Sequence, residues 1–326
     1  MPPIPPIASI GESLSSFAGA LGDFLGNLAR VDLGDVALGL AAFGVYLTLR
    51  AFAYFHVIRA AYPEEPIAFK RIWGAYFAAY GFNNVIPARG GDVIRLFLTR
   101  TSVPGSSYPA VASSFGVELI FDLCIGIPVL AFAFSQGVFP KPPDFARLPA
   151  FDLAFLAANP QLALFLLTAL AILVLVAVAL LSARVRAFWD RVRQGLAILR
   201  DRRRYLREVF LIQLVGWGFR FTAFWMLLEA FAVGGSIRNV LLVLGVNAVA
   251  ALVPFTPGGA GVAQALLAQV FAGTAAGATV AAYSVGAQIA VAAFSFAVGF
   301  AALVFVFRLR SFKQVLEQGK AARAGT

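Results

Sequence analysis

Long apolar stretches recur along the chain, and five of them are long enough to cross a lipid bilayer. They cover residues 36–59, 110–134, 162–182, 209–232 and 279–307. A helix of about 20 residues spans a hydrocarbon core of about 30 Å. The third stretch is uninterrupted and featureless, whereas the others contain Gly, polar or charged residues. We therefore expect five crossing helices, of which one faces lipid and four face protein.

Two further apolar regions, 72–99 and 240–271, are broken in the middle. The first contains GFNNVIPARGGDVIR and the second contains LVPFTPGGAGVAQ. Each arm has about 14 residues or fewer, about 21 Å as helix, so neither arm crosses alone. Pro87, Pro254 and Pro257 break helices. The pattern predicts two re-entrant helical hairpins, because irregular backbone at that depth is tolerated only inside protein or along a wet cavity.

The amino-acid composition supports the same conclusion, a protein that spans the membrane. Sixty percent of the residues are hydrophobic and 13% are charged, against about 25% charged in soluble domains. This favours an all-α polytopic membrane protein. Cys124 and His56 are the only residues of their types, which leaves little material for a disulfide, a zinc site or a Ser-His-Asp triad. We expect no metal, no cofactor and no enzymatic activity.

The net charge of +10 lies in two segments that flank apolar spans. Segment 183–208 holds nine Arg against three acidic residues, and segment 308–326 holds five Lys or Arg against Glu317. Basic segments beside membrane helices face the cytoplasm and anionic head groups. The charge therefore indicates a cell membrane protein, plasma or inner, and no nucleic-acid partner.

These charges also set a predicted topology. With both basic segments inside, the acidic segment 1–35 lies outside and the C-terminus is cytoplasmic. Segment 1–35 carries apolar residues at helical spacing, typical of an amphipathic interfacial helix, with packing on the bundle as the open alternative. Residues 36–307 form a single transmembrane domain, followed by the tail 308–326.

The order helix, hairpin, helix occurs twice within this domain, in 36–134 and in 209–307. A connecting helix and basic segment, 162–208, separates the two copies. The second copy enters from the opposite face, and each hairpin carries a Gly pair, Gly90-Gly91 in the first and Gly258-Gly259 in the second. Inverted repeats with broken helices point to a transporter site near the midplane of the membrane.

The hairpins carry the candidate substrate site. Helix N-termini attract anions, and arginine grips phosphate with two parallel hydrogen bonds. Asp92 would hold Arg89 or Arg95 in place when the site is empty, and the alternative is that both arginines anchor the hairpin at the interface. The candidate binding residues are Asn84, Arg89, Gly90, Gly91, Asp92, Arg95, Asn247, Thr256, Gly258, Gly259 and Gln264.

Three further charges lie within predicted spans. Glu118 and Asp122 are four residues apart, on one helix face, and Arg220 is mid-span. Two roles remain open for the acids, proton coupling and a salt bridge to Arg89, Arg95 or Arg220, and the available arginines favour the bridge. Arg50 is expected to snorkel to the membrane surface.

The segments NNVIPARGGDVIRLFL, VELIFDL and VPFTPGGAGVAQALL resemble the signature regions of the lysylphosphatidylglycerol synthase transmembrane region, or flippase-like domain, family. The resemblance covers about 36–307 without the soluble aminoacyl-transferase domain. It implies a helical membrane protein of lipid translocation or envelope lipid metabolism. The chain departs from the family pattern at Asp92, Leu119, Gln264 and Gln288, and these departures affect schemes of charge coupling.

Three functions follow as hypotheses. The first is a lipid transporter that moves an anionic phospholipid or polyprenyl-phosphate lipid between leaflets, with its head group between the hairpins. The second is an ion-coupled carrier of a small anion, and the third is a non-enzymatic scaffold in envelope lipid synthesis. A membrane enzyme is disfavoured by the single His and Cys. The sequence does not indicate an oligomeric state.

Overall fold

The computed structural model describes residues 26, 29–84, 86, 90–136, 188–251 and 261–308. Helices make up the fold throughout these residues, and the described part of the chain contains no strand. The predicted span 162–182, most of segment 1–35 and nearly all of the tail 308–326 lie outside the described residues, so their assignments stay predictions.

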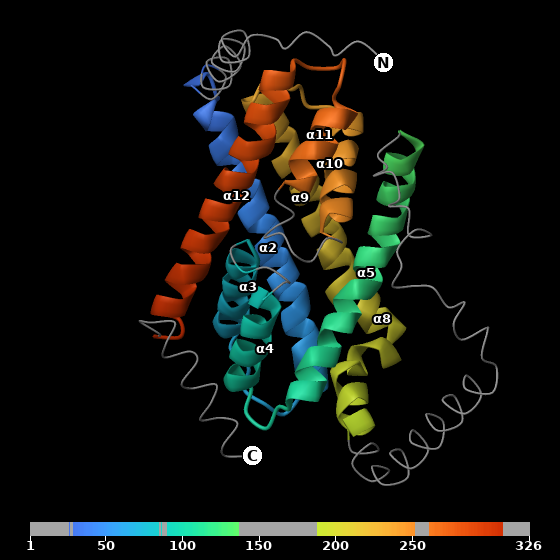
Figure 1. Ribbon diagram of the computed structural model, residues 1–326. Coiled ribbons are helices and arrows are strands. Elements are labelled where there is room, and N and C mark those ends of the chain that lie inside the picture. The colour runs from blue at the N-terminus through green and yellow to red at the C-terminus, as the bar shows by residue number, and fades with distance from the viewer. Residues whose placement is uncertain are drawn as a thin grey trace, which may run out of the picture.

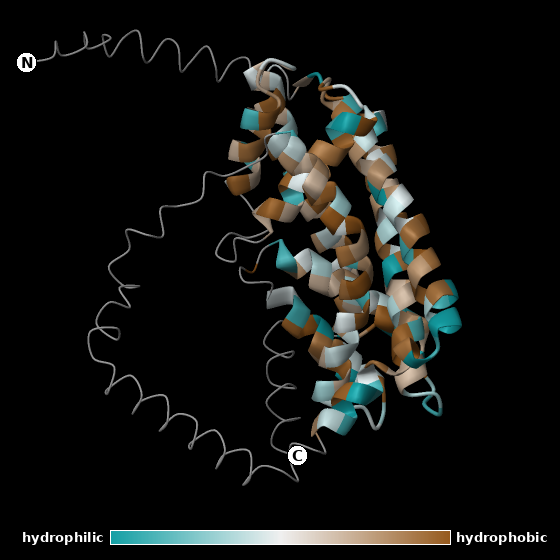
Figure 2. Cartoon of the chain, turned by 90° about the vertical axis from the view of Figure 1, so that its right-hand side faces the viewer, coloured by the Kyte–Doolittle hydropathy of each residue, from teal (hydrophilic) through white to brown (hydrophobic). Residues whose placement is uncertain are grey.

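Four described helices are long and apolar enough to cross a membrane. They are α2 (Leu33–Ala61), α5 (Tyr108–Ser135), the run Arg202–Ala230 and α12 (Gly277–Phe305). The third run consists of α8 (Arg202–Tyr205), a π-helical turn (Leu206–Phe210) and α9 (Leu211–Ala230). These helices confirm four of the predicted spans. Hydrophobic residues line the bundle along its length (Figure 2).

The helix starts follow from local capping. Asp32 accepts hydrogen bonds from the backbone N–H groups of Gly34 at 2.8 Å and Asp35 at 3.2 Å, so α2 begins at the next residue. Ser107 caps α5 through the N–H of Ala110. Such side chains satisfy N–H groups that have no partner within the helix.

Both broken regions form pairs of short helices. The first pair is α3 (Phe69–Asn83) with α4 (Gly90–Ser102), and the second is α10 (Ile237–Ala250) with α11 (Val262–Val270). The longest of the four has 15 residues, about 22 Å, which is shorter than a hydrocarbon core of about 30 Å. The two pairs lie in opposite halves of the bundle along its long axis (Figure 1).

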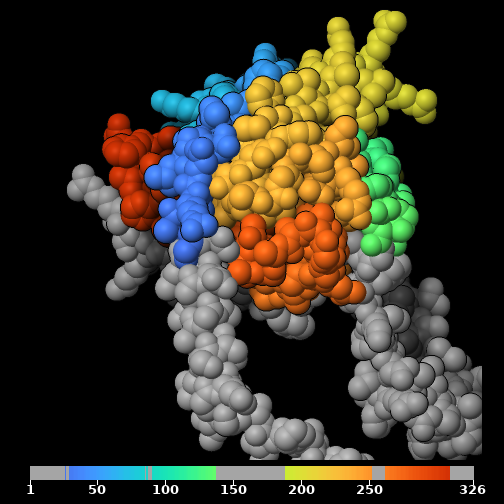
Figure 3. Space-filling model, turned by 90° about the horizontal axis from the view of Figure 1, so that it is seen from above, coloured from blue at the N-terminus to red at the C-terminus, as the bar shows by residue number. Residues whose placement is uncertain are grey.

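The two central helices, α2 and α9, run antiparallel. The N–H of Asp32 donates to the carbonyl of Ala230 at one end, and His56 lies 3.3 Å from Glu208 near the other. Seen from above, α9 to α11 fill the space between the start of α2 and the end of α5 (Figure 3).

Each outer long helix packs on a short helix from the other half of the chain. Helix α12 packs on α3, where Gly81 lies against the backbone of Ser295 and Phe296. Helix α5 packs on α10, where Gly245 lies against Ala133. A side chain at either glycine would collide with the neighbouring helix, so these glycines allow the close approach.

Candidate functional site

A cavity of about 730 Å³ lies at the centre of the bundle, and each of α2, α3, α4, α5, α9, α10, α11 and α12 contributes to its wall. Seven of the sequence-predicted site residues line it together. They are Asn84, Asp92, Arg95, Glu118, Asp122, Arg220 and Asn247. Apolar side chains such as Trp217, Phe224 and Leu267 form much of the remaining wall.

Arg95 and Glu118 form a buried ion pair on one side of this cavity. Arg95 Nη2 lies 2.5 Å from Glu118 Oε2, and the hydroxyl of Tyr76 donates to the other carboxylate oxygen at 3.2 Å. The guanidinium carbon also stacks 3.7 Å from the ring centroid of Tyr54. A buried charge is costly unless it is paired, so this pair holds α4 against α5. The salt-bridge role considered for Glu118 is the arrangement observed.

Arg50 forms a second ion pair next to the first. Its two terminal nitrogens bind the two carboxylate oxygens of Asp122 at 2.5 and 2.9 Å, and its Nε donates to Tyr76 at 2.8 Å. Arg50 also lies 3.9 Å from Glu118. The expectation that Arg50 snorkels is therefore wrong, because its guanidinium is buried and turned into the cavity wall.

Asn83 links the end of α3 to the start of α4. Its side-chain oxygen accepts from the N–H of Gly91 at 2.8 Å, and its side-chain nitrogen donates to Asp92 at 3.1 Å. Asn84 instead donates to the carbonyl of Tyr80. Asp92 thus bonds to Asn83, a partner that the sequence did not indicate. Gly91 is buried against the backbone of α3 rather than in the cavity wall.

Two uncharged side chains, Gln264 and Gln288, form a hydrogen-bonded pair between α11 and α12. The side-chain nitrogen of Gln264 donates to the side-chain oxygen of Gln288, and Gln264 also accepts from the N–H of Gly261 at 2.6 Å. Gln264 therefore caps α11 and joins it to α12. Gln288 and Asn247 line the cavity directly.

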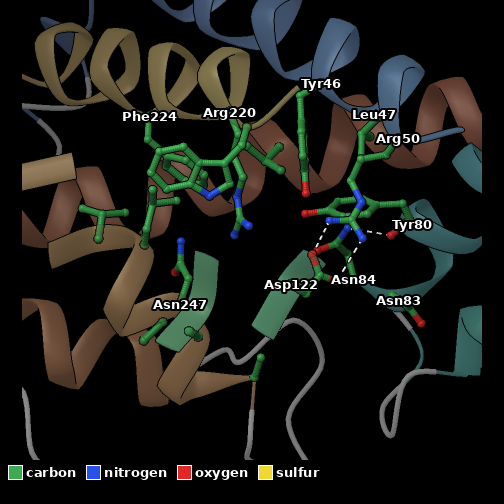
Figure 4. A pocket seen from close by; sticks show the side chains of 18 of the residues that line it. Tyr46, Leu47, Arg50, Tyr80, Asn83, Asn84, Asp122, Arg220, Phe224 and Asn247 are labelled. Atoms are coloured by element: carbon green, nitrogen blue, oxygen red, sulfur yellow. Dashed lines mark hydrogen bonds and ion pairs between the residues drawn. The ribbon is translucent and has the colours of Figure 1, made fainter. Parts of the chain in front are cut away.

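Arg220 enters the cavity from α9. Its guanidinium carbon lies 5.6 Å from the ring centroid of Tyr46 and 6.0 Å from that of Phe224. In the described ranges, no ion pair joins Arg220 to an acidic side chain. Figure 4 shows Arg220 and Asn247 pointing into the same part of the cavity, apart from the Arg50–Asp122 pair.

The structure brings part of the predicted set of residues together around the cavity. Arg89, Thr256, Gly258 and Gly259 lie outside the described residues. Gly90, Gly91 and Gln264 do not line the cavity, whereas the other described candidates do. Sequence reasoning missed Tyr46, Tyr76 and Asn83. Tyrosines inside apolar helices are the signal that could have found the first two, since their hydroxyls need partners at depth.

Comparisons with known proteins indicate a lipid-related membrane family. Residues 13–302 match the family described as the lysylphosphatidylglycerol synthase TM region. A stretch of 94 residues is 35% identical to Glycosyltransferase AglD of Haloferax volcanii. That stretch covers 27% of this chain and 14% of the relative, so the chain spans a small part of it. No solved structure matches the chain.

Proposed function

The chain belongs to the family of the lysylphosphatidylglycerol synthase TM region, and we propose on this basis that it transports an anionic lipid between the two leaflets of a membrane. The lipid is a phospholipid or a polyprenyl phosphate, and the protein acts without covalent chemistry. Its lipid-related family and its four spanning helices support this proposal.

The observation that carries the proposal is the central cavity of about 730 Å³ with its divided lining. Arg220, Asn247 and the two ion pairs offer polar contacts, while aromatic and aliphatic side chains cover the rest. A head group could leave water for such a cavity and exchange hydration for fixed dipoles and charges. Its acyl or prenyl tails would stay in the bilayer.

The proposal includes two halves of the chain related by an inverted repeat. Helix α3 starts at position 69 and α10 at position 237, while α5 ends at position 135 and α12 at position 305. The offset in residue number is nearly the same for both pairs. The helices of each such pair run in opposite directions along the bundle (Figure 1). The two offsets, 237 − 69 = 168 and 305 − 135 = 170 residues, support a repeat that inserts in two orientations.

Packing contacts recur at the same offset. Gly299 lies against the backbone of Phe77, and Gly245 lies against the carbonyl of Val129. Under the proposed repeat, position 77 corresponds to position 245 and position 129 to position 299. The contact between α3 and α12 therefore has its counterpart in the contact between α10 and α5. Near the centre, Gly216 of α9 lies against Tyr46 of α2, the position to which it corresponds in the first copy. A residue that touches its own counterpart is expected beside a two-fold axis.

In this arrangement each short-helix pair is a re-entrant hairpin. The pair α3–α4 enters from the cytoplasmic face and α10–α11 from the outer face, so the ends of each pair lie on one side. The N-terminus is then outside and the C-terminus cytoplasmic. Short helices that lie in opposite halves of the bundle support this topology (Figure 1).

Transport is tested in liposomes that contain the purified protein and a trace of fluorescent lipid. Dithionite, added outside, bleaches only the outer leaflet, so translocation appears as bleaching beyond about half of the signal. We expect faster bleaching of phosphatidylglycerol and polyprenyl phosphate than in empty vesicles. Rates equal to those of empty vesicles for every anionic lipid would contradict the proposal.

A further inference from the structure

The two halves of the cavity carry the same arginine but different neighbours. Arg50 on α2 lies four residues after Tyr46, and Arg220 on α9 lies four residues after Gly216. Tyr46 and Gly216 are the contacting pair beside the proposed two-fold axis. The two arginines are therefore counterparts under the proposed repeat, and both side chains line the same cavity.

The first arginine is neutralised within the protein. Asp122 binds it through two hydrogen bonds, and Glu118 lies 3.9 Å from it. Both acids belong to α5. Two carboxylates close to one guanidinium leave Arg50 little attraction for an external anion, because the local positive charge is already balanced.

The second arginine lacks both of these acids. At the offset that takes Arg50 to Arg220, the counterpart of Glu118 is Gln288 and that of Asp122 is Ala292. The position beside Ala292, Val291, lines the cavity and is also apolar. Gln288 bonds to Gln264 on α11, one position before Ala265, the counterpart of Arg95 at this offset. The second half thus has an amide pair where the first half has the Arg95–Glu118 ion pair between the equivalent helices.

Arg220 thus faces the cavity beside the aromatic rings of Tyr46 and Phe224. Within the described residues no acidic side chain contacts it. Rings at such distances attract a guanidinium only weakly. Arg220 is partly buried, and losing part of its hydration has a cost that the rings do not balance. An anion in the cavity would offset that cost.

We propose that Arg220 is the anion-recognition site of the cavity and that it binds the phosphate of a lipid head group. Because Ala292 stands where the repeat would place a counterpart of Asp122, Arg220 keeps its positive charge for an anion in the cavity. Asn247 points into the same space and would donate a further hydrogen bond (Figure 4). The site deepens the proposed lipid transport and rests on it for the identity of the ligand.

Binding is measured apart from transport. Purified protein in detergent is titrated with fluorescent phosphatidylglycerol, with phosphatidylcholine of the same chain length, and with glycerol 3-phosphate as the soluble source of phosphate. The wild type should prefer phosphatidylglycerol. Arg220→Gln should weaken its binding roughly ten- to hundredfold, the range for loss of hydrogen bonds to a charged group. Unchanged affinity in Arg220→Gln would overturn the proposal.

A second variant adds an acidic side chain on α12 instead of removing the arginine on α9. Ala292→Asp copies Asp122 into the second half and should neutralise Arg220, so it too should lose the preference for phosphatidylglycerol. Ala292→Asn has nearly the same size without the charge and should keep the preference. Equal affinity in the Asp and Asn variants would count against Arg220 even if Arg220→Gln failed to fold.

Together, the binding and transport measurements test the Arg220 site and the proposed lipid transport independently. Phosphatidylglycerol binding that depends on Arg220, in a protein that moves no lipid, would retain the site and refute transport. Lipid transport that survives Arg220→Gln unchanged would retain transport and refute the site. Tight binding of glycerol 3-phosphate without lipid binding would refute a lipid ligand.

Discussion

Arg95 and Glu118 form a buried ion pair at 2.5 Å that links the short helix α4 to the long helix α5. In the other half of the chain, Gln264 and Gln288 link α11 to α12. Under the proposed repeat Gln288 is the counterpart of Glu118, and Gln264 lies one position before Ala265, the counterpart of Arg95. The α4–α5 contact is therefore made with opposite charges and the α11–α12 contact with two amides, and the proposed repeat treats these as equivalent contacts. This difference allows the energetic role of the charges to be tested within one molecule.

Removing one partner of the Arg95–Glu118 pair should destabilise the protein strongly. Glu118→Gln leaves the buried Arg95 guanidinium without its carboxylate, at a cost of about 3–5 kcal/mol. The double variant Arg95→Gln, Glu118→Gln should recover part of this loss, because it leaves two amides that can bond to each other, as Gln264 and Gln288 do between α11 and α12. Thermal unfolding in detergent, followed by tryptophan fluorescence, measures both. A double variant no more stable than either single variant would contradict this interpretation.

Asp122 should matter less to stability than Glu118. Asp122→Asn removes the two-oxygen contact to Arg50, but Arg50 still lies 3.9 Å from Glu118 and bonds to Tyr76. The Asp122 side chain is also 45% exposed, and solvent screens an exposed pair. We expect a loss below that of Glu118→Gln in the same unfolding assay. The opposite order would show that Asp122 is the main counter-ion of Arg50.

The spanning helices were predictable because length and hydropathy alone identify a stretch that fills a bilayer. The two breaks were predictable because proline and glycine interrupt a helix wherever they stand. The ion pairs were not, since Arg50 and Asp122 lie far apart in the sequence and pairing depends on how the helices are rotated. The sequence places Arg50 near the membrane surface because the helix was predicted to end at 59. The structure ends α2 only two residues later, at Ala61. What the sequence did not show is that Asp122 and Tyr76 bind Arg50 inside the bundle.

The link between α3 and α4 is a second feature whose contacts the sequence could not specify. The adjacent pair Asn83 and Asn84 marked the turn, but only a rotation of about 100° about α3 decides which one bonds to Gly91. The structure assigns this to Asn83. In the second half, the corresponding turn lies outside the described residues, so Thr256, Gly258 and Gly259 remain predictions.

Gly91 is expected to tolerate no side chain. A Cβ at Gly91 would lie on the carbonyl of Ala79 and against Asn83, so Gly91→Ala must push α4 away from α3. In the described structure, a Cβ at Gly218 of α9 would meet no other part of the fold within 4 Å, so Gly218→Ala should be neutral or stabilising by up to about 1 kcal/mol. Midpoints of thermal unfolding compare the two. Equal midpoints would show that the α3–α4 contact is looser than described.

The topology makes a prediction that decides between hairpins and full crossings. In a Cys124→Ser background, Glu64→Cys and Thr101→Cys stand at the two ends of the α3–α4 pair, and Ile237→Cys and Thr274→Cys stand at the ends of α10–α11. All four positions are exposed. A membrane-impermeant maleimide applied to right-side-out vesicles should label the second pair and spare the first. Inside-out vesicles should give the reverse pattern.

Each outcome has a physical meaning because the short helices are too short to cross alone. Labelling of Glu64→Cys and Thr101→Cys from opposite sides would require α3 and α4 to form one crossing with a broken centre. The second copy would then lose its inverted relation to the first, and the equivalence of Arg50 with Arg220 would fail with it. Same-side labelling within both pairs would place the tips of the two hairpins inside the membrane, on either side of the cavity that holds Arg220.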